Sequence, residues 1–135
     1  MTWQNPVSAL VIDTSIWVEY FRGTPHPLVD NALQDGAVVL PMVVAAELLS
    51  GVRQTVEAAE LRDFLELLRP HGNQMAHWYR VGALRSVLAR KGLAISTPDA
   101  HVAQCALDLQ VPLYANNAVF PKIAKWTALK LAEEK

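Results

Sequence analysis

The sequence contains little cysteine, little net charge and no long hydrophobic run, and each of these absences excludes a class of protein. One of the 135 residues is cysteine, Cys105, so the chain cannot form an internal disulfide, which suits a reducing compartment. The formal net charge is −1, so any binding to nucleic acid must depend on a local cluster of charge or on a metal ion. The most apolar stretch, residues 37–46, contains Pro41 and is far shorter than the ~20 residues of a membrane-spanning helix.

The first residues do not have the pattern of a targeting signal. Residues 1–6 contain no basic segment followed by an apolar one, which predicts that there is no signal peptide. Apolar residues make up 52% of the chain and charged residues 19%, as is typical of a globular protein. We therefore expect a cytoplasmic protein in which residues 1–135 form a single domain.

Several common catalytic motifs are also missing. The chain has no glycine-rich loop of the kinds that hold nucleotide phosphates. No second aspartate follows two residues after Asp13, which disfavours the hydrolases that form an aspartyl-phosphate. We expect Cys105 to be a buried, unreactive thiol and His101 to lie at the surface. The spacing typical of zinc ligands is not found among the four histidines, which are His26, His71, His77 and His101.

Apolar residues recur in a pattern of strand followed by helix. The sequence predicts buried strands at residues 8–12, 38–40 and 111–115, and a weaker fourth at 128–131. Helices are predicted at about residues 14–23, 27–34, 41–51, 61–68 (ended by Pro70), 75–91 and from 97 to beyond 107. This alternation indicates an α/β fold with a central parallel sheet of about four to five strands flanked by helices.

Three acids lie where a carboxylate needs a partner. Asp13 directly follows the apolar residues 9–12, Glu47 interrupts the apolar residues 43–49, and Asp99 lies at the start of a predicted helix. In α/β sheets, ligands bind outside the carboxyl ends of the strands, so these positions are expected to share one rim. A divalent cation is the simplest single partner for three carboxylates, and it would serve phosphodiester hydrolysis.

Each acid also has a purely structural explanation. Asp13 has the properties of a helix N-cap, and Asp99 those of a first-turn acid favoured by the helix dipole. Glu47 can extend its carboxylate from an apolar helix face to solvent. The three structural explanations together are less plausible than any one alone, although periodicity does not decide between them.

The three acids lie in three short segments, which are residues 11–17 with Asp13, residues 47–51 with Glu47, and residues 99–103 with Asp99. In this order the segments resemble the successive conserved blocks of PIN-domain ribonucleases, in particular the VapC toxins of bacterial toxin–antitoxin pairs. The resemblance extends from residue 10 to about residue 131 and implies a parallel-sheet α/β fold. It also implies that Asp13, Glu47 and Asp99 bind Mg²⁺ or Mn²⁺ for the cleavage of RNA, often a transfer RNA. Thr14 or Ser15 would then orient a ligand or hold a water.

The last block departs from the family pattern. Asn117 stands where a fourth acid is common, and Val119 replaces another acid. An asparagine carbonyl can still hold a cation or a water, but one negative charge is lost, which makes a second metal ion less certain than the first. We therefore expect catalytic roles for Asp13, Glu47, Asp99 and Asn117.

The resemblance predicts a Mg²⁺-dependent endoribonuclease that is inhibited by a VapB-like antitoxin. A homodimer is also expected, because large apolar side chains gather near the first helix. Two alternatives stay open. One is a weak or inactive PIN scaffold that binds RNA or protein without cutting, and the other is a metal-dependent phosphatase acting on small substrates.

Overall fold

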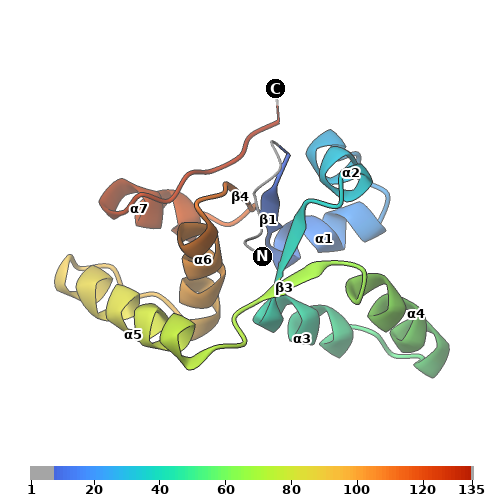
Figure 1. Cartoon of the computed structure of the whole chain (residues 1–135), viewed down its shortest axis with the longest axis horizontal. Helices are drawn as coiled ribbons and strands as arrows, with labels where there is room; N and C mark the ends of the chain where they lie inside the picture. Colours follow the sequence, from blue (N-terminus) through green and yellow to red (C-terminus); the bar gives the residue numbers. More distant parts are fainter. Residues whose placement is uncertain (1–7, 135) are drawn as a thin grey trace, which may run out of the picture.

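A computed structural model describes residues 8–134 and contains four parallel strands surrounded by helices (Figure 1). The strands are β1 (Leu10–Ile12), β2 (Val38–Pro41), β3 (Arg69–His71) and β4 (Leu113–Tyr114), and their order in the sheet is β3-β2-β1-β4. All three strand pairs are parallel. Every residue of β1, β2 and β4 is buried, so these strands read as short apolar runs without alternation. The predicted α/β class with a central parallel sheet is confirmed.

Helices connect and cover the strands. Their bounds are α1 (Thr14–Phe21), α2 (Pro27–Gln34), α3 (Met42–Ser50), α4 (Thr55–Leu65), α5 (Met75–Arg90), α6 (Thr97–Leu109) and α7 (Val119–Trp126). Helix α6 packs against β1, β2 and α3, with α5 and α7 beside it. None of the helices in residues 8–134 is long and apolar enough to cross a membrane.

The structure differs from the sequence prediction mainly around residue 70. Helix α4 begins at Thr55 and ends at Leu65, and residues 69–71 form strand β3 instead of the end of a helix. Pro70 has no N–H to donate, but β3 lies at the edge of the sheet, where a proline is tolerated. Residues 128–131 contribute only a single bridge from Leu131 to Leu113, and helix α7 was not predicted.

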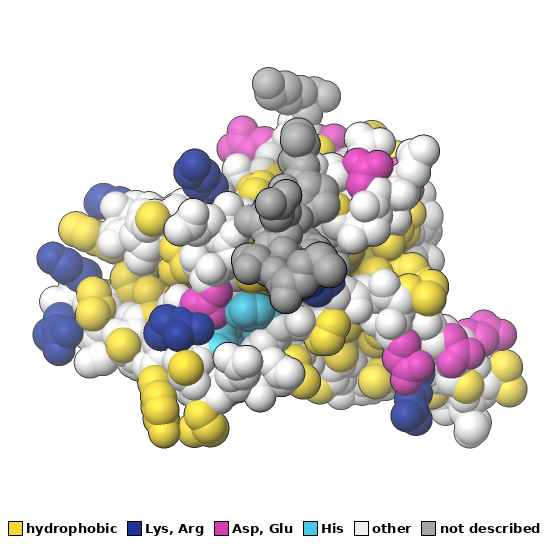
Figure 2. Space-filling model, viewed as in Figure 1, with side chains coloured by type: hydrophobic (Ala, Val, Ile, Leu, Met, Phe, Trp, Pro, Cys, Tyr) yellow, Lys and Arg dark blue, Asp and Glu magenta, His cyan; other side chains and the backbone are white. Residues whose placement is uncertain are grey.

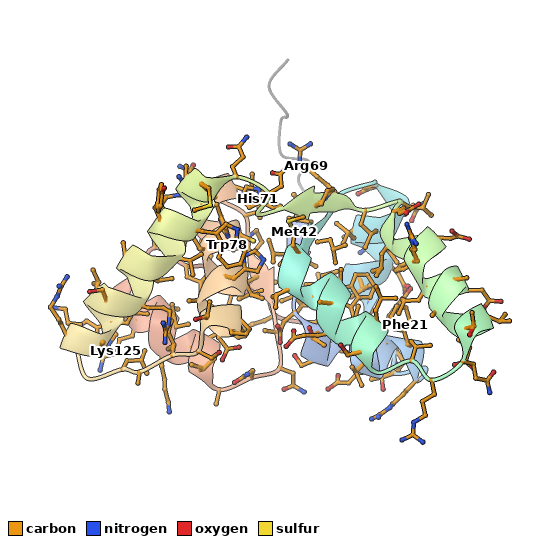
Figure 3. All side chains as sticks on the ribbon, turned by 90° about the horizontal axis from the view of Figure 1, so that it is seen from below. Phe21, Met42, Arg69, His71, Trp78 and Lys125 are labelled. Atoms are coloured by element: carbon orange, nitrogen blue, oxygen red, sulfur yellow. The ribbon has the colours of Figure 1, made fainter. Side chains whose placement is uncertain are left out.

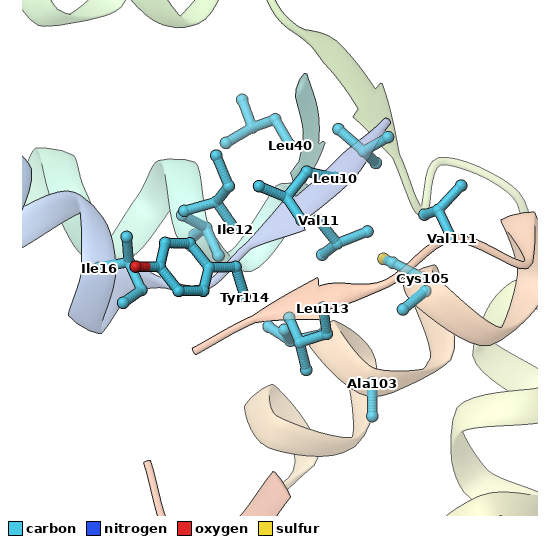
Figure 4. Close-up of a cluster of buried hydrophobic side chains, with 14 of the residues drawn as sticks. Leu10, Val11, Ile12, Ile16, Leu40, Ala103, Cys105, Val111, Leu113 and Tyr114 are labelled. Carbon is cyan, nitrogen blue, oxygen red and sulfur yellow. The ribbon is translucent and has the colours of Figure 1, made fainter. Parts of the chain in front are cut away.

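The apolar core lies on both faces of β1, between the sheet and α6 on one side and α1, α2 and α3 on the other. Figure 4 shows Cys105 of α6 among the buried side chains of this core, and its expected burial is confirmed. The expected surface position of His101 is wrong, because its side chain is fully buried. Helix α6 is covered on several sides, so a residue two positions after Asp99 faces α5 instead of solvent.

Candidate metal and active site

Asp13 lies at the junction of β1 and α1 and caps the helix. Its Oδ2 atom accepts hydrogen bonds from the Ser15 hydroxyl (2.9 Å) and the Ser15 backbone N–H (3.4 Å). Its own N–H donates to the Tyr114 carbonyl (3.0 Å), which fixes the end of β1 beside β4. Capping alone does not require the carboxylate to be buried, yet Asp13 is only 7% exposed.

The electrostatic setting of Asp13 is unfavourable for its charged form. Burial raises the pKa of the Asp13 carboxyl, and hydrogen bonds from Ser15 and the Thr14 backbone oppose that effect only in part. The negative charge of Asp99 raises this pKa further, which shows that the two acids lie within electrostatic reach of each other. A buried carboxylate next to a second one is the arrangement that a bound cation relieves.

Asp99 and Glu47 are brought to the same end of the fold by α6 and α3. The Asp99 backbone N–H donates to the hydroxyl of Ser96, the N-cap of α6 (3.2 Å), which places Asp99 in the first turn of that helix. Glu47 is exposed on α3, and its Oε1 accepts a hydrogen bond from the Thr14 hydroxyl (2.7 Å). Thr14 directly follows Asp13, so this hydrogen bond holds Glu47 next to the end of β1.

Asp13, Glu47 and Asp99, which we call the carboxylate rim, offer only oxygen donors, and such a set suits Mg²⁺ or Mn²⁺. Within residues 8–134, the structure contains three side chains close enough together to surround one ion, but they lie elsewhere in the fold. The three acids of the carboxylate rim are not that close together. Like charges repel, so we expect the three carboxylates to approach one another only when a cation lies between them. Their convergence on one metal ion stays a prediction.

The two neighbouring asparagines have different contacts. Asn116 faces the first helix: its N–H donates to the Ser15 hydroxyl (3.1 Å) and its Nδ2 donates to Glu19 Oε2 (2.6 Å). Asn117, which the sequence pattern placed in the site, accepts a hydrogen bond from the Val119 N–H (3.0 Å) at the start of α7. The catalytic role assigned to Asn117 stays a prediction, and Asn116 is a second amide on the same loop.

Glu19 is an acid that the sequence analysis did not single out. Hydrogen bonds from Asn116 and His26 lower the pKa of its carboxyl, so it is ionised at neutral pH. It also connects the loop after β4 to the buried His26, whose Nε2 donates to Glu19 Oε1 (2.9 Å). The available signal was its position four residues after Ser15, which places both side chains on one face of α1.

The chain belongs to the PIN-domain family, whose profile matches residues 10–125. PIN domains are nucleases and generally use a divalent metal ion. No curated protein matches the sequence significantly.

The fold is shared with several solved complexes. One of them is VapBC2 from Rickettsia felis bound to a DNA fragment from their promoter. Its matching chain has 24% sequence identity to this one and a TM-score of 0.72, and the match covers 92% of this chain and 97% of the other. DNA-bound VapBC from Salmonella typhimurium is 17% identical, with a TM-score of 0.74 over 92% and 96% of the two chains. A toxin–antitoxin complex from Klebsiella pneumoniae is 19% identical, with a TM-score of 0.65 over 82% and 88%. These similarities show a common fold.

Proposed function

We propose that this chain is a VapC-like toxin, a Mg²⁺- or Mn²⁺-dependent endoribonuclease of the cytoplasm that hydrolyses phosphodiester bonds in RNA. The observation that carries the proposal is the buried Asp13 carboxylate, whose pKa is raised by burial and by the charge of Asp99. Perturbed carboxylates of this kind are typical of functional sites. Membership of the PIN-domain family and the toxin–antitoxin complexes that share the fold support the same function.

The residues of the chain divide the work between binding and positioning. Asp13, Glu47 and Asp99 would hold the cation, with the Asn117 amide assisting. When bound, the cation supplies Lewis acidity at the phosphate and makes water a better nucleophile. Thr14 holds Glu47 through its hydroxyl, and Ser15 orients Asp13.

Ser15 also links the two sides of the site, because its hydroxyl donates to Asp13 and accepts from the Asn116 N–H. Glu19 in turn fixes the Asn116 side chain. These contacts hold the carboxylate rim and the loop after β4 in one arrangement before RNA arrives, and such preorganisation favours catalysis.

The partner that we propose is a VapB-like antitoxin, and the surface of α1 and α4 supports it. Phe21 is 49% exposed and stacks on Trp17 with ring centroids 5.5 Å apart, while Leu67, just beyond α4, is 81% exposed. Phe64 packs edge-on against Phe21 at 5.7 Å. An apolar antitoxin segment on this surface could place an arginine at the carboxylate rim, where bidentate pairing with a carboxylate is strong. We also propose a homodimer.

The function is tested by cleavage of RNA with purified protein, first on transfer RNA, with Mg²⁺ and with excess chelator. Asp13→Asn and Asp99→Asn should each abolish cleavage while the circular dichroism spectrum stays unchanged. Asp63→Asn, which alters an exposed acid of α4, is the matched control and should cleave normally. Normal cleavage by Asp13→Asn, or cleavage that survives chelation, would contradict the proposed site.

Two further measurements separate the alternatives. A scaffold would bind RNA without shortening it, and a small-molecule phosphatase would hydrolyse a generic phosphomonoester.

Co-expression with the protein encoded next to this gene should suppress growth arrest if that neighbour is the antitoxin. Light scattering of the purified chain, with and without this neighbour, tests the homodimer.

A further inference from the structure

A second cluster of side chains able to bind a metal lies between β3, α5 and α6. One ligand atom each of His71, His77 and Cys105 lies within 4.8 Å of the others. His77 and Cys105 are buried, while the His71 side chain keeps 23% of its surface exposed. Figure 3 shows His71 at the end of β3 with Trp78 of α5 beside it. Each ligand comes from a different element, so an ion here would join three parts of the fold.

Asp108 orients both histidines. Its Oδ2 accepts hydrogen bonds from His71 Nε2 (2.9 Å) and His77 Nδ1 (2.7 Å), which leaves a second nitrogen on each ring. The carboxylate is itself fixed, because Arg80 and Gln104 donate to its Oδ1 at 2.7 and 2.8 Å. Histidines that bind metals commonly donate their other ring nitrogen to a carboxylate in this way.

The donor set differs in kind from that of the carboxylate rim. Two imidazole nitrogens and one sulfur suit Zn²⁺ or Co²⁺, whereas Mg²⁺ prefers oxygen. We propose that His71, His77 and Cys105 form a site for a transition-metal ion of the Zn²⁺ class, which ties β3 to α5 and α6. This inference does not depend on the proposed nuclease activity.

Binding requires two local changes. Tetrahedral nitrogen and sulfur ligands lie about 3.3–3.8 Å apart, so the three donors must approach by about 1 Å. His77 Nε2 now faces His101 Nδ1 at 2.7 Å, and this contact must open. Burial raises the pKa of the Cys105 thiol, so without an ion it keeps its proton. On binding, the sulfur–metal bond replaces the S–H bond and one proton leaves to the buffer.

An ion can reach the cluster from solvent. Figure 2 shows histidine side chains at the surface in the lower centre of the view, between acidic and basic side chains. His71 is the partly exposed ligand, and Arg80 and Asp108 form an ion pair next to it. Trp78 donates to the Gly72 carbonyl (2.8 Å) and stacks on His101 at 4.5 Å, which holds the wall behind the site.

The test uses Co²⁺ as a spectroscopic probe for Zn²⁺ on the full chain after treatment with chelator. One equivalent should give the intense visible bands of tetrahedral cobalt together with a thiolate-to-cobalt charge-transfer band in the near ultraviolet. Because Cys105 is the single cysteine, this band identifies its ligand without ambiguity. Zn²⁺ should displace the cobalt, and a pH-stat should record one proton released per ion at neutral pH.

Variants decide the assignment. Cys105→Ser should lose the charge-transfer band, and His71→Gln, which changes the partly exposed ligand, should lose the tetrahedral bands, with folding checked by circular dichroism. Asp13→Asn is the control and should keep both signals. The site is excluded if Co²⁺ gives no charge-transfer band, or if His71→Gln binds it as the unaltered chain does. A weak octahedral spectrum that Asp13→Asn abolishes would place cobalt at the carboxylate rim only and would also overturn the proposal.

Discussion

The carboxylate rim and the histidine cluster (His71, His77, His101, Cys105 and Asp108) are both built in part on α6. Each contains an acid with little exposed surface, but the pKa values of the two acids are shifted in opposite directions. Asp13 receives side-chain help from Ser15 alone, and its pKa is raised by burial and by Asp99. The Asp108 side chain is likewise only 7% exposed, but hydrogen bonds from four side chains outweigh the effect of this burial and hold its pKa well below the usual range. In the histidine cluster, protein side chains stabilise the charge of Asp108, whereas the charge of Asp13 in the carboxylate rim is left for a bound cation to balance.

The largest effect on stability is expected when Asp108, the acid held by these hydrogen bonds, is replaced. Asp108→Asn replaces an acceptor of five hydrogen bonds by an amide whose NH₂ faces other donors. Breaking a buried, paired charge in this way costs about 3–5 kcal/mol of the free energy of unfolding. Urea denaturation at neutral pH in chelator measures it, with Asp63→Asn as control. A loss below about 1 kcal/mol would mean that the cluster contributes little to the stability of the fold.

The second effect is a dependence of stability on pH that comes from His101. Burial, and then the neighbouring His77 and His71, lower the pKa of His101 to about 4, against the weaker opposing effect of Asp108; Cys105 faces it as a neutral thiol. The unfolded chain, with a pKa near 6.5, then binds the proton more readily. Stability is therefore complete above about pH 6.5 and falls as the pH drops towards 4, by about 3 kcal/mol in total.

Denaturation at several pH values between 7 and 4.5 checks this dependence. His101→Gln should show a flatter profile over that range, and the comparison concerns slopes, so a change in absolute stability does not affect it. Titration of the His101 ring by NMR reports its pKa directly, and a value near 6.5 would show the prediction to be wrong.

The third effect concerns the backbone beside the histidine cluster. Gly72 has φ +109°, and a Cβ atom there would collide with the His101 ring atom Cε1. Gly72→Ala should therefore cost about 2 kcal/mol of the free energy of unfolding. Gly82→Ala is the matched control, since Gly82 lies in α5 with nothing near its Cβ position, and alanine there should be neutral or stabilising. Equal effects at the two glycines would contradict the close contact.

These contrasts also explain what could be predicted from the sequence. The three buried strands and Asp13 were predictable, because short apolar runs followed by an N-cap residue are a local signal. Strand β3 was not predictable: its residues 69–71 are polar or proline, and they become a strand by pairing with β2. The histidine cluster was missed for the same reason, since its ligands are far apart in sequence. His101, Cys105 and Asp108 do follow helical i, i+4, i+7 spacing, but the apolar face of α6 was the stronger pattern.

The fourth effect has the opposite sign and sharpens the difference between the two acids. Asp13→Asn should raise the free energy of unfolding by about 1 kcal/mol in chelator, because it removes an uncompensated charge while asparagine still caps α1. The raised pKa gives the same sign: the carboxyl favours its protonated form in the folded state, so stability is lost as the pH rises through that pKa. Thermal denaturation at pH 7 measures it, and a destabilised variant would mean that Asp13 is kept for capping alone.

The smallest effect is expected at Thr14, which positions a rim acid without being part of the rim. Its hydroxyl donates to Glu47 Oε1, and Thr14→Val keeps the shape of the side chain but removes this donor. Because this hydrogen bond is exposed to solvent, it contributes only about 0.5 kcal/mol, which corresponds to roughly a twofold drop in RNA cleavage at limiting Mg²⁺. If Thr14 only holds Glu47 in place, saturating Mg²⁺ should restore most of the rate, because the cation itself can then order the carboxylate. Thr55→Val, at the exposed start of α4, is the control. A loss that saturating Mg²⁺ does not repair would instead place the Thr14 hydroxyl in direct contact with the RNA or the attacking water.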